Sequence, residues 1–393
     1  MLQETSVRTQ LDAAARDRTR VLVVGAGVAG LTAAGILRRR GLHPVLIERS
    51  GPDAPSGYML ALMPLADPAL ADLGATDEYR ARSTPIDRYR IRDHRGAVAR
   101  DYTMGALLDT YGDYRGISRG ELLAALAAPG GTVTRRARVT LLDARPEAVT
   151  AVIAHGGNET EAVFDAVVVA DGLHSQTRAH VTGTAAERDT GWGGWVAWTS
   201  ADADADLAEE LWGVGSFVGA YPVKDRLGTI VCAPATAAAA GLPAFIARIR
   251  ERTPHLSERF DRVLTEAADG RETYYWPLTD CRSAVWARGR IALVGDAAAG
   301  FLPTAGIGAG MAMESARALA IRLAGADDVP AALAAYERDQ RPRVEAAQRN
   351  SRQLAPLLFN TGRTAAAVRD AAVRFVPLGA ALGPIRKLLD SRP

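Results

Sequence analysis

Three glycines near the start of the chain, Gly25, Gly27 and Gly30, follow the apolar run "VLVV" in the pattern G-x-G-x-x-G. In such a turn the first glycine permits a tight bend, the second lets the backbone approach a pyrophosphate, and the third allows a helix to pack closely on the strand. Backbone N–H groups and the positive end of the helix dipole then favour phosphate oxygens. The chemistry that this spacing predicts is the binding of a dinucleotide.

A carboxylate, Glu48, ends the apolar run "PVLIE" that follows the helical stretch after these glycines. At the end of a second strand, a carboxylate accepts hydrogen bonds from both ribose hydroxyls of an adenosine and repels a 2′-phosphate. FAD or NAD therefore suits the segment better than NADP. A glycine-rich turn without a ligand is the alternative interpretation, but both strands and the acidic terminus are present, which favours nucleotide binding.

Two later segments also carry an apolar strand that ends at an acidic residue beside glycine. The first, "FDAVVVADGLHSQTR", reaches Asp171, and the second, "GRIALVGDAAAGFLP", reaches Gly295 and Asp296 before a glycine-studded loop and a long apolar helix. A plain turn is the alternative interpretation of Asp171. A helix N-cap is that of Asp296, although a carboxylate there can serve both roles.

The three segments, in this order and at this separation, resemble the FAD-dependent aromatic hydroxylases of the para-hydroxybenzoate hydroxylase type, the class A flavoprotein monooxygenases. The resemblance extends from about Val21 to about Ala347. It includes "ISRGELLAAL", similar to the family's arginine-bearing helix start, and "YYWPLTDCRSAVWARGRIALVGDAA", similar to its lead-in to the third motif. It implies an α/β fold with a Rossmann-like (GR2-type) FAD-binding domain, an inserted mixed or antiparallel β-sheet substrate domain and C-terminal helices.

The resemblance also implies which residues hold the cofactor. Arg119 would lie near the pyrophosphate or the flavin, Asp171 near the pyrophosphate, and Asp296 on a ribityl or ribose hydroxyl; a surface cation at a helix start is the alternative for Arg119. The start of the long helix would lie under the flavin, where backbone N–H groups stabilise negative charge on the reduced ring. The implied set is Gly25, Gly27, Ala29, Gly30, Glu48, Arg49, Arg119, Asp171, Gly295, Asp296, Pro303, Gly306 and Gly308.

Two positions depart from the family pattern, Ala299 where histidine is usual and Gly310 where asparagine is frequent. Neither usual residue is required for FAD binding, so the departures concern flavin contact and substrate specificity. The segment "PDAPSGYMLALMPLADPALADLGA" resembles one that passes near the flavin, where Met59 and Leu60 would line the substrate pocket; a loop and helix of no special role is the alternative.

The order of these segments predicts an FAD-binding domain of residues 19–75, 105–183 and 286–347. A substrate-binding sheet of residues 76–104 and 184–285 is inserted into it, and a C-terminal helical segment of residues 348–393 follows. Aromatic residues are frequent in the inserted part and form either an ordinary core or the wall of a planar apolar pocket. They are Trp192, Trp195, Trp198, Trp212, Tyr221, Tyr274, Tyr275 and Trp276, with Trp286 just beyond.

The activity implied by the resemblance is that of an FAD-dependent monooxygenase consuming NADPH or NADH. It would insert one atom of O₂ into an aromatic or polycyclic small molecule through a flavin C4a-hydroperoxide. The alternatives are a related flavoenzyme with another outcome (Baeyer–Villiger oxidation, epoxidation, reduction or cyclisation) and an FAD-binding protein without turnover. The sequence singles out no catalytic residue, and whether the chain forms a homodimer is left open.

Composition excludes several other classes. The 47 basic and 45 acidic residues nearly cancel, which gives no support for nucleic-acid binding. Cys232 and Cys281 are too few for a disulfide framework, so a cytoplasmic location is expected. The histidines lack metal-ligand spacing, and no apolar run is long enough to span a membrane. The apolar, basic C-terminal stretch is expected to pack across the domain junction rather than to lie on a membrane surface.

Overall fold

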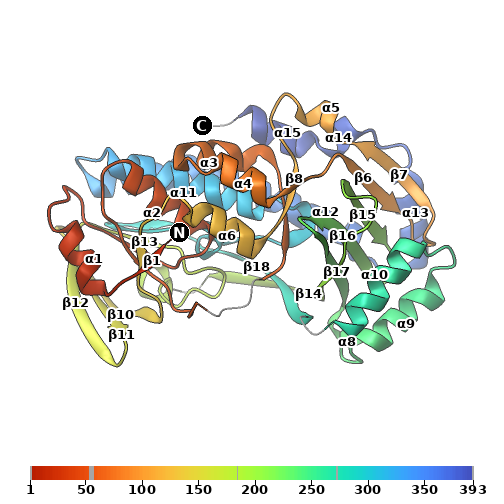
Figure 1. The fold of residues 1–393 in the computed structure, drawn as a ribbon, viewed down its shortest axis with the longest axis horizontal. Helices are drawn as coiled ribbons and strands as arrows, with labels where there is room; N and C mark the ends of the chain where they lie inside the picture. Colours follow the sequence, from red (N-terminus) through yellow and green to blue (C-terminus); the bar gives the residue numbers. More distant parts are fainter. Residues whose placement is uncertain (1, 53–56, 184, 271–272, 392–393) are drawn as a thin grey trace.

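The computed structural model describes residues 2–52, 57–183, 185–270 and 273–391 (Figure 1). Two large sheets organise this part of the chain, one with five strands and one with eight. Helices pack on both of them, and the predicted α/β fold class is confirmed.

The five-stranded sheet is built from the apolar runs that lead into the three glycine-bearing motifs. Its strands are β2 (Val21–Val24), β3 (Val45–Ile47), β13 (Ala166–Val169), β19 (Ala287–Arg288) and β20 (Ile291–Leu293). In the order β19-β20-β13-β2-β3, every pair is parallel except the edge pair β19-β20. The parallel strands are buried along their whole length, as expected for strands covered on both faces.

The register of this sheet places three strand ends side by side. Val169 lies opposite Val24 on one side and Leu293 on the other, and Val24 also lies opposite Ile47. Because parallel strands end at the same edge of a sheet, the residues that follow them are neighbours in space. The sheet therefore gathers motif residues that are far apart in the sequence.

Helices α2 (Val28–Arg39) and α11 (Gly308–Ala324) pack together on one side of this sheet (Figure 1). The long helix α12 (Val329–Leu358) is joined to the sheet by the hydroxyl of Tyr336, which donates to the carbonyl of Leu293 at 3.1 Å. Small residues in α2 let its neighbours approach closely. A Cβ on Gly35, for example, would lie 2.4 Å from a methyl carbon of Leu73.

The eight-stranded sheet is mostly antiparallel, with one parallel pair, β15-β6, so the predicted mixed sheet is confirmed. Its order is β21-β18-β14-β17-β16-β15-β6-β7. The strands are β6 (Arg88–Arg92), β7 (Val98–Thr103), β14 (Ala186–Ser200), β15 (Leu207–Trp212), β16 (Phe217–Val223), β17 (Arg226–Pro234), β18 (Tyr274–Arg282) and β21 (Ala299–Gly300).

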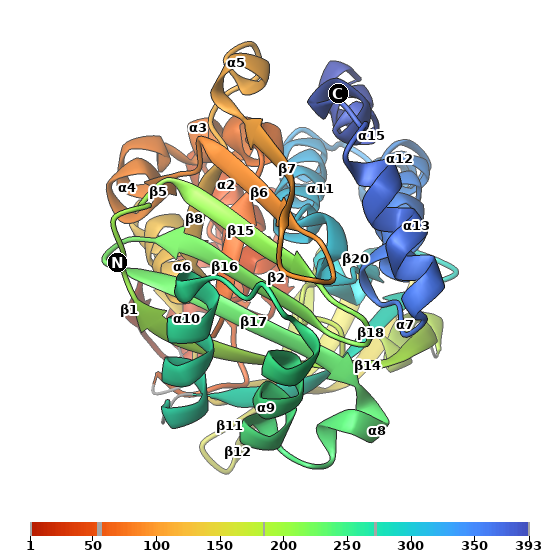
Figure 2. The same ribbon diagram turned by 90° about the vertical axis from the view of Figure 1, so that its right-hand side faces the viewer.

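Helices α9 (Leu242–Arg252) and α10 (Glu258–Asp269) cover one face of this sheet, which we call the outer face (Figure 2). Strand residues that point outward, such as Leu211 and Val218, pack with Phe260 of α10 in an apolar cluster. Alternation along each strand sends the intervening residues to the opposite face. The outer face and the two helices therefore enclose a separate hydrophobic core.

The opposite face, which we call the inner face, is turned toward β4 (Met59–Leu62) and β8 (Arg115–Ser118). A Cβ on Gly228 would lie 2.2 Å from the Cβ of Met59, so the methionine occupies the space that this glycine leaves open. The inner face therefore lies against segments that adjoin the five-stranded sheet.

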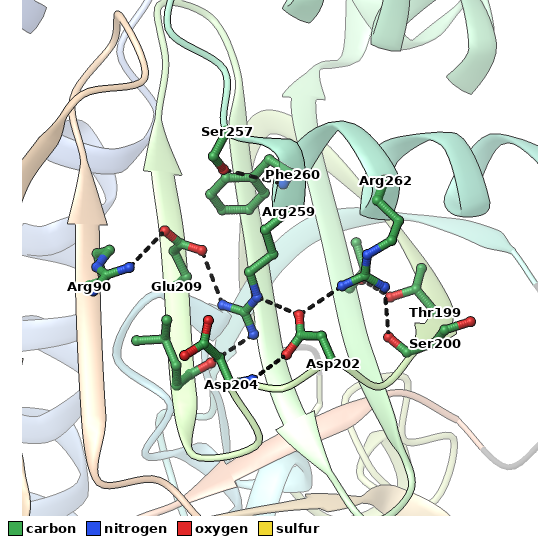
Figure 3. A network of polar contacts seen from close by, with 12 residues as sticks. Arg90, Thr199, Ser200, Asp202, Asp204, Glu209, Ser257, Arg259, Phe260 and Arg262 are labelled. Atoms are coloured by element: carbon green, nitrogen blue, oxygen red, sulfur yellow. Dashed lines mark hydrogen bonds and ion pairs between the residues drawn. The ribbon is translucent and has the colours of Figure 1, made fainter.

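A network of ion pairs joins α10 to the outer face (Figure 3). At its centre Glu209 of β15 is fully buried and accepts from Nε of Arg92 at 2.6 Å and from Nη1 of Arg259 at 3.1 Å. Asp202 pairs with Arg259 at 2.7 Å and with Arg262 at 2.8 Å. Positively and negatively charged side chains thus alternate in this network and link α10 to the outer face.

The remaining elements include a separate three-stranded antiparallel sheet within residues 137–164. They are β1 (Gln3–Glu4), α1 (Val7–Ala14), η1 (Pro64–Ala66), α3 (Asp67–Leu73), α4 (Thr76–Arg82), β5 (Thr84–Pro85), α5 (Gly105–Leu108), α6 (Arg119–Ala127), β9 (Thr132–Val133), β10 (Ala137–Ala144), β11 (Val149–His155), β12 (Asn158–Phe164), α7 (Ala179–Thr182), α8 (Ala235–Ala238), η2 (Gly295–Ala297), η3 (Pro303–Ala305), α13 (Arg363–Val373), α14 (Leu378–Ala381) and α15 (Gly383–Asp390).

The C-terminal helices contact both halves of the molecule. Helix α13 lies beside β7, where the hydroxyl of Tyr102 donates to the carbonyl of Val376 at 2.9 Å, and α15 lies against α12. Helix α12 continues through residues 347 and 348, so the limit predicted there falls inside a helix, and the division into domains stays a prediction. Within the described ranges, no helix combines the length and apolar character that a membrane span needs.

Candidate active site

The residues after β2, β13 and β20 touch one another. Gly25 has a φ of +103°, and a Cβ there would lie 2.5 Å from the carbonyl oxygen of Ala170. Gly295 has a φ of +62°, and its Cβ would lie 2.8 Å from the Cβ of Ala29. Both positions require glycine, for conformation and for space. The three motifs recognised in the sequence therefore meet in one place.

The turn between β2 and α2 leaves room for a ligand at one glycine and none at another. A Cβ on Gly30 would lie 1.8 Å from the carbonyl oxygen of Gly25, so helix α2 begins tightly against its own turn. A Cβ on Gly27, by contrast, would meet only Nη2 of Arg119, at 4.0 Å. The N-terminus of a helix and a guanidinium thus face each other, an arrangement that favours a pyrophosphate.

Arg119 is held by the start of its own helix. The preceding Ser118 caps α6, its Oγ accepting from the N–H of Glu121 at 3.1 Å, and the N–H of Arg119 donates to the carbonyl of Tyr58 at 2.8 Å. The Ser118 hydroxyl thus satisfies a free backbone N–H of the first turn, which explains why the helix begins here. Arg119 is thereby placed near Gly27, far away in the sequence.

Glu48 is half-buried at the end of β3 and is engaged by backbone donors. Its Oε2 accepts from the N–H of Ala26 and its Oε1 from that of Ser50, both at 2.7 Å. A carboxylate can accept about four hydrogen bonds, so capacity for ribose hydroxyls remains. Arg49 beside it is exposed.

Asp171, after β13, carries an unsatisfied oxygen. Its Oδ2 accepts from the N–H of Thr177 at 3.2 Å, whereas its Oδ1 is buried and has no partner among the described residues. A buried acceptor without a donor costs about 1–3 kcal/mol. An unmet acceptor at this strand end fits a site that receives an N–H or hydroxyl donor from a ligand.

Asp296 lies in the turn η2 directly after β20. Its side chain reaches solvent, but protein atoms crowd around it, and this desolvation raises its pKa to about 6, while the positive charge of Arg119 lowers it. Burial raises the pKa of Tyr58, with a further increase from Asp296. Asp296, Arg119 and Tyr58 are therefore close enough to influence one another.

The loop before α11 lies between β4 and α12. Gly306, with a φ of +63°, would place a Cβ 3.5 Å from the carbonyl oxygen of Ala61, and Thr304 donates to the carbonyl of Ser351 at 2.7 Å. This loop includes Pro303, and it leads into Gly308, the first residue of α11. The predicted helix start is thus near β4. Residues 53–56 of the segment expected near the flavin lie outside the described residues.

The two departures from the family pattern occupy tight places. Ala299 is buried in β21 opposite Arg282. A Cβ on Gly310 would lie 3.2 Å from the Cβ of Leu65, so a larger side chain there would press on the neighbouring turn.

The aromatic residues expected in a pocket wall divide among three places. On the side of the inner face, the Trp276 ring lies 5.3 Å from that of Tyr58 and 5.6 Å from that of Tyr274. Trp195 belongs to the outer face, with Tyr275 at 5.0 Å. The remaining members of this division are Trp192, Trp198, Trp212 and Tyr221 on the inner face, and Trp286 with Tyr336 beneath the five-stranded sheet.

Three inner-face residues, Trp212, Phe217 and Tyr221, keep between 5% and 9% of their surface accessible. On the outer face Leu211 and Val218 keep 0%, although Trp195 keeps 8%. Part of the inner face therefore reaches accessible surface. Phe359, just after α12, lies beside this face with its ring stacked on Trp192 at 4.8 Å.

Sequence reasoning missed several residues of this region, namely Tyr58, Tyr89, Tyr114, Glu210 and Phe359. Adjacent glutamates, as at Glu209 and Glu210, usually indicate a solvated stretch, and only the burial of the whole strand β15 shows otherwise. The roles assigned to the individual cofactor-binding residues stay predictions.

Comparisons with known proteins agree with this architecture. A family model described as "FAD binding domain" matches residues 18–351. The chain is 32% identical over 370 residues to 3-amino-4-hydroxybenzoate 2-monooxygenase PtnB3 of Streptomyces platensis, covering 86% of this chain and 87% of that protein. It is 28% identical to 3-hydroxybenzoate 6-hydroxylase 1 of Aquipseudomonas alcaligenes, covering 89% and 92%.

The fold is shared with a solved structure of Klebsiella pneumoniae HpxO complexed with FAD and uric acid. The TM-score is 0.85 at 23% identity, over 96% of this chain and 98% of that one. Taken with the site described above, these similarities show that the chain belongs to the FAD binding domain family and is an FAD-dependent enzyme of the monooxygenase and aromatic hydroxylase kind.

Proposed function

We propose that the enzyme uses NADPH or NADH and O₂ to place one oxygen atom on an aromatic or polycyclic small molecule. The observation that carries the proposal is the meeting of three strand ends around Gly27, with the Arg119 guanidinium at 4.0 Å from where its Cβ would be. A second support is the chemistry in the names of its relatives, which act on a hydroxybenzoate and an aminohydroxybenzoate.

The residues at the strand ends suit the parts of FAD. Gly27 and Arg119 would hold the pyrophosphate, Glu48 the adenosine ribose, and the unmet Oδ1 of Asp171 a donor of the nucleotide. The redox chemistry, which is acceptance of a hydride and reaction with O₂, belongs to the bound FAD.

The chain's own contribution is position, charge and exclusion of water. The N-terminus of α11, at Gly308, offers backbone N–H groups and a positive dipole end to negative charge nearby. The rings of Trp276, Tyr58 and Tyr274 are partly accessible and offer an apolar surface to a planar substrate. Transient binding of the nicotinamide cofactor, the C4a-hydroperoxide route, a cytoplasmic location and homodimer formation stay predictions.

The decisive experiment follows the oxygen atom. FAD-loaded protein is screened with aromatic compounds for ligand-stimulated NADPH and NADH oxidation, and the product formed under ¹⁸O₂ is analysed by mass spectrometry. We expect one labelled oxygen per product. Turnover that continues without O₂, or a product without label, would show a reductase or another flavoenzyme instead.

A further inference from the structure

One carboxylate of the inner face, Glu210, is buried among neutral hydrogen-bond donors. Its Oε2 accepts from Nε1 of Trp212 at 2.7 Å, its Oε1 accepts from the hydroxyl of Tyr221, and the hydroxyl of Tyr89 also donates to it. Among the described residues, no ion pair reaches this carboxylate, and Tyr114 lies near enough to feel its charge. Glu210 therefore differs from an ordinary buried carboxylate, which is paired with a cation.

The direction of these hydrogen bonds gives the group a definite polarity. A tyrosine hydroxyl has one proton, and in Tyr221 and Tyr89 that proton is directed at Glu210, so each hydroxyl can offer only oxygen lone pairs to a further partner. The carboxylate itself can accept about four hydrogen bonds and receives three here. We call Glu210, Tyr221 and Tyr89 the acceptor cluster, because it accepts hydrogen bonds and has no free proton to donate.

The acceptor cluster borders accessible space. Glu210 keeps 6% and Tyr221 keeps 8% of their surface, as do other residues of the inner face, whereas Glu209, which precedes it, keeps 0%. The cluster lies on three neighbouring strands, β6, β15 and β16, and β16 adjoins β17, the strand that packs on Met59. A small molecule held between the inner face and the five-stranded sheet would therefore lie within reach of the acceptor cluster.

From this geometry we infer that the acceptor cluster selects the substrate: the aromatic compound carries a hydrogen-bond donor, an amino or hydroxyl group, toward Glu210 and not a carboxylate. The inference rests on the proposed function, since it names the substrate class of the same site. A donor satisfies the remaining acceptor capacity, whereas a second carboxylate would meet a like charge and only lone pairs. Burial raises the pKa of Glu210, and a cationic or donor group beside it opposes that rise.

The test is a binding comparison between two ligands that differ in one group. FAD-loaded protein is titrated with aniline and with benzoate, and with 2-naphthylamine and 2-naphthoate, so that neither carboxylate ligand has a hydroxyl donor, and binding is followed by the change in flavin absorbance. We expect the amino compound of each pair to bind at least about tenfold more tightly, the scale of one charged hydrogen bond. Tighter binding of the carboxylates, or failure of both amino compounds to bind at millimolar concentration, would overturn the inference.

Glu210→Gln sharpens the test because it reverses the polarity of the cluster. The indole N–H of Trp212 can only donate, so it keeps the amide oxygen, and the amide N–H₂ then faces the two tyrosines, whose hydroxyls are free to donate onward. We expect the preference for the amino compound to shrink by about tenfold or more. A preference that stays within about twofold of the wild-type value contradicts the inference.

Glu209→Gln is the matched control, because the same change is made one residue away on the outer face. It should leave the ratio of the two affinities unchanged in the FAD-loaded fraction. If Glu210→Gln does not load FAD, the wild-type preference alone still decides the inference. Binding with the expected preference but without ¹⁸O in a product would count against the proposed function and not against the acceptor cluster.

Discussion

Glu209 and Glu210 are neighbours on β15 with opposite surroundings. Glu209, on the outer face, is bound by Arg92 at 2.6 Å. Arg259 at 3.1 Å and Arg90 at 4.0 Å also contact it, as Figure 3 illustrates. Glu210, on the inner face, is bound by two phenols and an indole. The same side chain thus meets cations on one face and neutral donors on the other.

The difference concerns what each carboxylate can still do. Glu209 has its charge neutralised by arginines, of which Arg259 also joins α10 to the sheet, so it stabilises the fold. The charge of Glu210 is met by neutral hydrogen bonds alone, and desolvation raises its pKa. A buried carboxylate without a cation is costly for stability, and its position beside accessible space is what suits it to a ligand.

The largest expected effect comes from removing the charge of Glu209. Glu209→Gln leaves Arg92 and Arg259 without their buried counter-ion, and the free energy of unfolding should fall by about 3 kcal/mol. Urea denaturation followed by circular dichroism measures this loss. A change below about 1 kcal/mol would mean that the arginines are solvated well enough without the carboxylate, and the contrast between the faces would be lost.

Glu48 extends the comparison to a carboxylate held by backbone N–H groups. Glu48→Ala should weaken FAD binding by about 1–3 kcal/mol through loss of charged hydrogen bonds, as measured by fluorescence titration of the apoprotein. Arg40→Ala, at an exposed position just after α2, is the control and should alter FAD affinity much less. Equal losses in the two variants would remove the special role of Glu48.

Asp296 is a carboxylate whose pKa is shifted by its surroundings. Its folded-state pKa of about 6 lies above the unfolded value, so the folded protein binds the proton more tightly and this contribution to stability declines as pH rises from about 4 to 6. An ionised Asp296 accepts a nucleotide hydroxyl more strongly, so FAD affinity should rise by severalfold over the same interval.

The measurement is an FAD titration repeated between about pH 4 and pH 7, from the unfolded-state pKa to above the folded-state pKa of about 6. Asp296→Asn should flatten the profile, because the amide does not titrate. A profile that the substitution leaves unchanged would assign the pH dependence to another group.

The smallest effect is expected for the stability of Glu210→Gln. The amide avoids the desolvation penalty of a charge and keeps its bond to Trp212, so the free energy of unfolding should change by no more than about 1 kcal/mol. The same urea experiment compares it with Glu209→Gln. Equal losses in the two variants would mean that Glu210 is as structural as its neighbour.

The sequence could predict the cofactor half of the molecule because its signals are local. Gly25, Gly27 and Gly30 are fixed by a turn and a helix that follow within a few residues, and the strand ends at Asp171 and Asp296 depend only on parallel pairing. The local backbone conformation that requires glycine at each of these positions can be recognised from the sequence pattern. This part of the prediction needed no long-range register.

The substrate half could not be predicted in the same way, because the face to which a strand residue points depends on register. Strand β14 has a register shift between Asp189 and Gly193 against β18, and such a shift changes which residues share a face. Trp192 and Trp195 are three residues apart and lie on opposite faces, as alternation along a strand requires, but the sequence does not show which face borders a ligand. Glu210 was missed because adjacent glutamates usually indicate a solvated stretch.

The ring of Phe359 stacked on Trp192 has a consequence for how such enzymes diversify. Phe359 lies beyond residue 351, where the match to the family model ends, yet it forms one boundary of the space beside the inner face. The nucleotide-binding strands and this boundary are separate stretches of chain. A change in the C-terminal stretch can therefore alter the surface beside the inner face while the nucleotide-binding strands are unchanged.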